Sequence, residues 1–150
     1  MKRIISLLAL TLIVLAVTVQ AQESKSSTRL QAQHKYNTRF LEKHLKQTEA
    51  SLVKALDDSS VGMQKNSLQT IRELEQIFPE YPFSSLLIPL ENKLRDENAN
   101  GVVRMLVAIA LDGLHSDAGD AIVKETSVSS KDNGLKTLCE ALAIKSGLYK

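Results

Sequence analysis

The stretch LIPLENKLRDENANGVVRMLVAIALDGL, residues 87–114, decides the fold. Its leucines recur three and four residues apart, which predicts an amphipathic helix from about residue 85 to residue 96. Pro89 falls in or near the first turn of that helix, where a missing N–H costs little. The next helix, expected over about residues 102–114, is apolar on nearly all sides, so we expect it to form the centre of the core.

Further helices are expected on both sides of this stretch, because apolar residues recur there with helical spacing. They span residues 28–56, 63–78, 118–124 and 134–146, the last two being separated by a polar loop at 126–133. The turn-forming residues 57–60 divide the first helix from the second. No segment alternates with a period of two residues, so no strand is predicted and the expected fold class is all-α.

The helices also repeat along the chain. Residues 52–58 and 90–96 share Leu, Leu and Asp at an offset of 38, and residues 63–74 and 103–114 share apolar positions at an offset of 40. A weaker third unit places Leu135-Lys136 where Val103-Arg104 stood. Helix pairs that repeat about every 40 residues are the signature of stacked α-solenoid units.

On these residues the chain resembles the HEAT-repeat family over roughly residues 51–146, and it is similar to short, signal-bearing HEAT-like proteins of environmental bacteria. The clearest match is Leu87 to Asp96, then Val103-Arg104, then Val107, Ala110-Leu111 and Leu114. The resemblance implies a short right-handed α-solenoid of antiparallel helix pairs, with two to three units. It also implies a protein-binding or scaffold role and no chemistry. The first unit departs from the family pattern at Gln64, where HEAT units usually carry Arg.

Residues 1–21 read as a secretory signal peptide. Lys2 and Arg3 precede an uncharged run of 16 residues, and Val19-Gln20-Ala21 places small residues where signal peptidase requires them. The alternative is an uncleaved anchor, but the run is shorter than the roughly 20 residues that span a bilayer. We therefore expect an exported protein, periplasmic or secreted, with no stable membrane insertion after cleavage. Residues 22–27 are expected to be disordered, and residues 28–150 to form the helical domain.

Charge and composition exclude some partners. The 150 residues include 19 Lys+Arg and 17 Asp+Glu, and loss of Lys2 and Arg3 with the leader brings the net charge to zero. A neutral chain with no Trp and 4% aromatic residues is poorly equipped to bind nucleic acid. The single cysteine, Cys139, is expected to be buried in a helix; the alternatives are a disulfide between two chains and a reactive thiol.

Catalytic, cofactor-binding and metal-binding motifs are not found in the sequence. Asp112, His115, Asp117 and Asp120 form its one acidic cluster, and we interpret it as turn and capping residues, with a weak divalent-ion site as the alternative. The sequence has no Gly-x-Ser-x-Gly elbow and no glycine-rich phosphate loop. We therefore expect a protein that is not an enzyme and needs no cofactor, with a small hydrolase or metal-dependent enzyme as the alternative.

Four residues are candidates for partner binding. Arg104 could recognise a carboxylate of the partner, although pairing with an acidic turn residue of a neighbouring unit is the simpler expectation. Phe78, Tyr81 and Phe83 could form an exposed aromatic contact, or could pack in the core around a proline-bent turn. The leading hypothesis is an interaction module that binds a protein or peptide on a helical face. The alternative is a self-associating structural protein of the cell envelope, a homo-oligomer that uses the stripe at 28–56.

Overall fold

The computed structural model describes residues 38–148, and all regular secondary structure in that range is helical. The chain divides into two units, residues 1–45 and residues 46–150. In the first unit, residues 38–45 are helical, and the rings of Phe40 and His44 meet at an angle with their centroids 4.2 Å apart. The expected signal peptide, the segment 22–27 and the first ten residues of the helix predicted at 28–56 lie outside the described residues.

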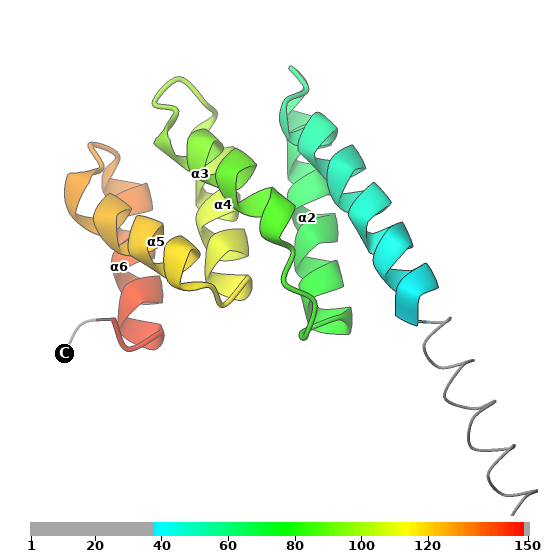
Figure 1. Ribbon diagram of the computed structural model, residues 1–150. Helices are drawn as coiled ribbons and strands as arrows, with labels where there is room; N and C mark the ends of the chain where they lie inside the picture. The colour runs from blue at the N-terminus through cyan, green and yellow to red at the C-terminus, as the bar shows by residue number, and fades with distance from the viewer. Residues whose placement is uncertain (1–37, 149–150) are drawn as a thin grey trace, which may run out of the picture. The chain divides into compact units, whose positions relative to one another are not determined.

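The second unit begins with the helical residues 46–56 and continues through helices joined by short connections. Four of these helices start at a polar residue whose side-chain oxygen accepts hydrogen bonds from backbone N–H groups of the first turn, as good N-caps do. These caps are Ser60, Asn100, Ser116 and Asp132. In chain order the elements are α2 (Val61–Ile77), the short 3₁₀ helix η1 (Ser84–Leu86), α3 (Leu87–Arg95), α4 (Gly101–Gly113), α5 (Asp117–Ser129) and α6 (Asn133–Lys145), shown in Figure 1.

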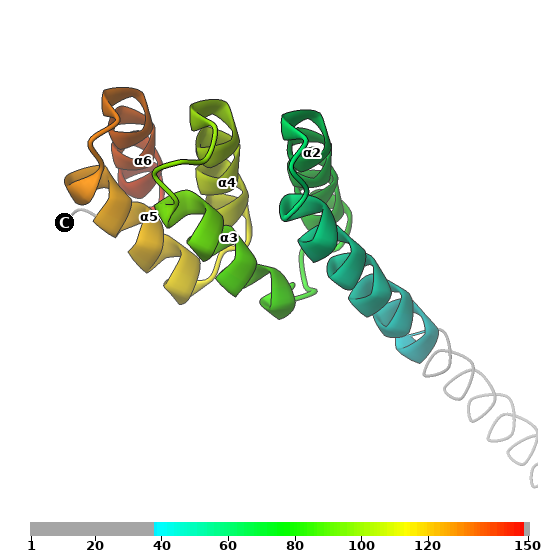
Figure 2. The same cartoon turned by 90° about the horizontal axis from the view of Figure 1, so that it is seen from above.

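Helix α4 is the packing centre of the second unit, because it contacts α2, α3, α5 and α6. Its buried side chains include Val103, Val107 and Leu111, all fully excluded from solvent, as its nearly all-round apolar composition predicted. In Figures 1 and 2, α2, α4 and α6 lie side by side in one layer, and α3 and α5 lie in a second layer. The described chain is therefore all-α.

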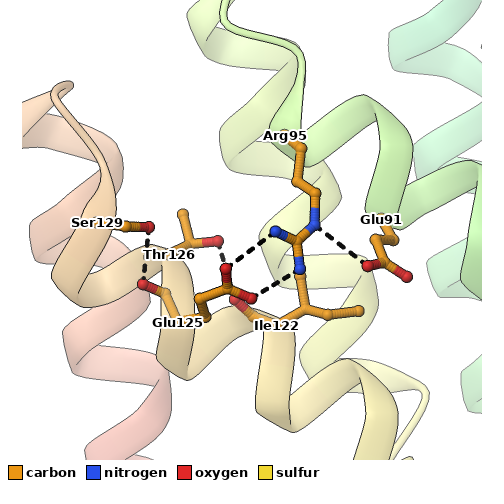
Figure 3. A network of polar contacts seen from close by, with 6 residues as sticks. All are labelled: Glu91, Arg95, Ile122, Glu125, Thr126 and Ser129. Carbon is orange, nitrogen blue, oxygen red and sulfur yellow. Dashed lines mark hydrogen bonds and ion pairs between the residues drawn. The ribbon is translucent and has the colours of Figure 1, made fainter.

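An ion-pair network ties α3 to α5 on the surface of the second layer, as Figure 3 shows. The guanidinium of Arg95 donates to both carboxylate oxygens of Glu125, over 2.9 and 2.7 Å, and its Nε donates to Glu91 over 3.1 Å. Arg95 lowers the pKa of Glu125 through these hydrogen bonds. The side chains of Arg95 and Glu125 are exposed and that of Glu91 is partly exposed, so the network adds little stability.

The prediction of a short helix at 118–124 followed by a loop at 126–133 was wrong. Helix α5 continues to Ser129, and only residues 130–132 connect it to α6. The hydroxyls of Thr126, Ser127 and Ser129 donate to backbone carbonyls three or four residues earlier, so the last turn is helical although its composition resembles a loop. The other predicted helix boundaries in the second unit lie within two residues of the observed ones.

Candidate functional site

A cavity of about 360 Å³ opens at the edge of the second unit where α2 and α4 end. This edge is the lower one in Figure 1, where α6 also ends. Glu75 lines the cavity from the last turn of α2, Asp112 and Gly113 line it from the last turn of α4, and Lys145 lines it from the end of α6. The volume falls in the lower part of the range found for ligand sites, so it can hold one amino-acid side chain or a small molecule.

The three aromatic residues singled out in the sequence all line this cavity. Phe83 is only 2% exposed and belongs to the core, whereas Phe78 and Tyr81 are half-buried. The rings of Tyr81 and Phe83 meet edge to face with centroids 4.7 Å apart. The Tyr81 hydroxyl lies 3.1 Å from Oε2 of Glu49 and donates to it. Phe83 therefore packs in the core, which was one of the two interpretations of this segment, and the other two rings lie at the cavity wall.

Glu75 is the unusual polar group of the cavity. Its Oε1 is buried and has no hydrogen-bond partner, a property that among the described side chains it shares only with Oε1 of Glu49. Burial raises the pKa of Glu75 to about 7; Arg72 opposes the shift and Asp112 adds to it. A charged acceptor that is buried without a partner is unfavourable, so the neutral, protonated form of Glu75 is favoured.

Gly113 makes room for the Glu75 carboxylate. A Cβ built on Gly113 would overlap Oε2 of Glu75 and would lie 3.0 Å from its Cδ. The backbone of Gly113 is helical, so no unusual conformation requires a glycine at this position. The absence of a side chain is therefore needed for the carboxylate to sit against the end of α4.

Asp112 is held in place by the end of α6. Its side chain is buried, with one carboxylate oxygen 2.8 Å from Nζ of Lys145 and the other 2.8 Å from Oγ of Ser146. Both oxygens of Asp112 thus have partners within the chain, in contrast to Oε1 of Glu75. Within residues 38–148, no group of three or more His, Cys, Asp or Glu side chains could hold a metal ion.

Two residues with positive φ lie at the cavity, and they are the only non-glycine residues with positive φ in the described part of the chain. Phe83 has a φ of 40° immediately before η1, and His115 has a φ of 47° in the turn after α4. Such conformations are uncommon for residues with a side chain, and they concentrate at functional sites. The two turns that border the cavity are therefore the strained parts of this backbone.

The fourth sequence candidate, Arg104, lies away from the cavity. Its side chain is 9% exposed, and its Nε donates to the carbonyl oxygen of Leu94, 2.9 Å away, at the end of α3. Gln64, 40 residues earlier in the chain, donates to the carbonyl oxygen of Asp58, 2.6 Å away. Both side chains close the end of a preceding helix, so Arg104 offers no open guanidinium to a partner.

Cys139 is fully buried, as the sequence predicted. Burial raises the pKa of its thiol to about 11, against a smaller opposite effect of Arg104. A thiol with such a pKa and no access to solvent is a poor nucleophile and a poor disulfide partner.

Sequence reasoning missed Glu75, although a signal for it exists. Leu68, Ile71, Glu75 and Phe78 follow one another at spacings of three, four and three residues, which places an acidic residue on the buried face of α2. The pattern identifies Glu75 as a residue on the buried face. It does not show that the ends of α2 and α4 lie together around its carboxylate, because that depends on tertiary packing.

None of the helices in the described part of the chain is both long enough and apolar enough to cross a membrane. A scan against protein-family models, a search of curated proteins and a search of solved structures each returned no match to this chain.

Proposed function

We propose that this chain is an exported, non-enzymatic binding module that holds a peptide segment of a partner protein in the cavity at the ends of α2 and α4. The observation that carries the proposal is the cavity itself, which is lined by the half-buried rings of Phe78 and Tyr81 together with charged side chains such as Glu75 and Asp112. Concave sites that combine aromatic surface with converging polar groups are typical of ligand binding. None of the described residues that line the cavity is Ser, Thr or Cys, so the commonest hydrolase nucleophiles are not found beside Glu75.

The architecture proposed for the module is a short right-handed α-solenoid of HEAT-like antiparallel helix pairs, two to three units long. Contacts of α2 with α4, of α4 with α6 and of α3 with α5 support this arrangement, since in a solenoid each unit packs on the next. The side chains of Gln64 and Arg104, 40 residues apart, give further support, because each donates to a backbone carbonyl at or just past the end of the preceding helix.

Export is proposed on the leader pattern of residues 1–21. Intact-mass measurement of the protein recovered from its native cells tests it. A chain that begins near Gln22 supports export by signal cleavage, and an intact Met1 contradicts it.

Peptide binding is tested by selecting a displayed random-peptide library on the immobilised protein and titrating the enriched peptides into ¹⁵N-labelled protein. We expect amide shifts centred on residues 75–83 and 112–115. Removal of the Phe78 ring in Phe78→Ala should weaken binding about tenfold, because it removes apolar wall area. The matched control is Ile88→Ala, since Ile88 is 68% exposed on α3 and does not line the cavity. A library without enrichment, or shifts confined to another surface, would overturn the proposal.

A further inference from the structure

Glu75 does not pair with the cation that lies one turn before it on the same helix. Arg72 precedes it by three residues, and side chains at this spacing are neighbours on a helix surface that can form an ion pair. Both side chains line the cavity, and that of Arg72 is exposed. Even so, no ion pair joins the two in the part of the chain that the structure describes.

The carboxyl group is turned into the packing between α2 and α4 instead. Its Oε1 is buried and has no hydrogen-bond partner, and its Oε2 occupies the space that a side chain at Gly113 would need. Burial without a hydrogen bond penalises the charged form of a carboxyl group more than the neutral form. Burial accordingly raises the pKa of Glu75 to about 7. This inward position therefore suits the protonated side chain.

The same position is unfavourable for a charged carboxylate. Asp112, in the last turn of α4, raises the pKa of Glu75 further by charge repulsion. Helix α4 has no basic residue in its last turn, so the partial negative charge of its C-terminus is not balanced at Gly113, its final residue. Arg72 has the opposite effect and lowers the pKa. Ionisation of Glu75 therefore favours a position closer to Arg72 and farther from the end of α4.

The remaining charged or titratable groups at the cavity come from the other segments packed around it. Lys145 on α6 is paired with Asp112 over 2.8 Å. Tyr81, in the turn after α2, donates to Glu49 of the preceding helical segment. His115 lies in the turn after α4 and is exposed. Arg72 is thus the permanently charged cation best placed to receive the ionised carboxylate, because it lies on the same helix and one turn away.

We infer that Glu75 is a two-position switch at the cavity: its uncharged side chain lies inward against Gly113, and its charged side chain turns outward to pair with Arg72. The proton is exchanged with water, and no ligand takes part, so the switch stands apart from the proposed function. The outward position empties the space beside Gly113 and places an ion pair among the residues that line the cavity. The shape and the charge of the cavity therefore change together as Glu75 titrates.

The test measures the orientation of the Glu75 side chain in the full-length protein labelled with ¹³C and ¹⁵N. Three-bond couplings of Cγ to the backbone nitrogen and of Cδ to Cα report χ1 and χ2, which occupy distinct staggered positions. The ¹³C shift of the carboxyl group reports its ionisation. We expect the couplings to change between pH 5.5 and pH 8.5, with the same midpoint as the carboxyl shift.

Two substitutions should hold the side chain in one position. Gly113→Ala fills the inward space, so at pH 5.5 it should show the couplings that the unchanged protein shows at pH 8.5, and the pKa of Glu75 should fall toward its ordinary value. Arg72→Met removes the outward partner, so it should raise the pKa of Glu75 and reduce the change in couplings. The matched controls are Gly62→Ala, where a Cβ makes only ordinary contact, and Arg95→Met on the exposed surface of α3. Both should behave like the unchanged protein.

Couplings that stay constant while the carboxyl group titrates overturn the inference, because the carboxylate then ionises in place. Inward couplings retained by Gly113→Ala at pH 5.5 overturn it as well. A change in couplings that persists in full in Arg72→Met, and is lost in His115→Gln, also overturns it, since His115 would then be the outward partner. Failure of peptide selection on the immobilised protein leaves these measurements unaffected, so the switch and the proposed function can fail separately.

Discussion

Gly113, the last residue of α4, leaves the space in which the carboxylate of Glu75 on α2 is placed. The two residues are 38 positions apart in the sequence, so helix packing alone brings them together. A side chain at position 113 would displace the carboxylate of Glu75. The cavity and its unpartnered oxygen depend on this pair.

The pair predicts a coupling between two substitutions. The two substitutions are Gly113→Ala and Glu75→Ala. Ala is favoured over Gly in a helix by about 0.5–1 kcal/mol, so Gly113→Ala should stabilise the protein that already carries Glu75→Ala. With Glu75 present, the new Cβ forces the carboxylate to move, and we expect most of that gain to be lost. A double-mutant cycle from urea unfolding should give a coupling energy of about 1 kcal/mol. Additive effects would show that the carboxylate does not contact Gly113.

Glu75 also predicts how stability changes with pH. Its pKa is raised from 4.5 to about 7 in the folded chain, so between these values the folded state binds more protons than the unfolded state. Stability therefore falls as pH rises through this window, and ionised Glu75 destabilises the fold above pH 7. After allowance for its partial exposure, Glu75→Gln should add about 1–2 kcal/mol at pH 8 and little at pH 4.5.

The measurement is the free energy of unfolding in urea at the two pH values, with Glu73→Gln as the control for the same chemical change at an exposed site. An equal effect of Glu75→Gln at both pH values would mean that Glu75 titrates as an ordinary exposed carboxyl.

Two arginines should contribute unequally to stability. Arg104→Met keeps most of the buried volume but leaves the carbonyl oxygen of Leu94 without its donor, so we expect a loss of about 1.5–3 kcal/mol. Arg95→Met removes three hydrogen bonds of the exposed network with Glu91 and Glu125 and should destabilise the fold less than Arg104→Met does, because exposed ion pairs add little stability. Thermal unfolding of the two variants side by side tests the order. If Arg95→Met were the more destabilising variant, the structural role assigned to Arg104 would be wrong.

Cys139 should be unreactive in the folded protein. Its thiol is fully buried and its pKa is raised to about 11, so little thiolate forms at neutral pH. A disulfide reagent that yields a coloured product should modify it only after denaturant unfolds the chain. Rapid modification in the absence of denaturant would show that the α6 region opens to solvent.

The helices could be predicted from the sequence because their evidence is local. Apolar residues three and four positions apart marked α3 and α4, and the turn-forming residues 57–60 marked the boundary before α2. The end of α5 was missed because its hydroxyl side chains bond back to its own carbonyls, which makes a helical turn resemble a loop in composition.

The candidate site could be predicted only in part. Phe78 and Tyr81 stood out because aromatic residues are rare in this chain and these lie beside prolines. Glu75 did not stand out among many polar residues, and its raised pKa arises from burial by the ends of other helices. Arg104 carried a recognisable repeat pattern, but its hydrogen bond to Leu94 places it inside the fold.

The most direct test is the pKa of Glu75 in the folded protein, measured from the ¹³C shift of its side-chain carboxyl. We predict a pKa near 7, because burial at the ends of α2 and α4 favours the neutral form of the carboxyl. A carboxyl that titrates near 4.5 would contradict the buried position of Glu75 at the cavity.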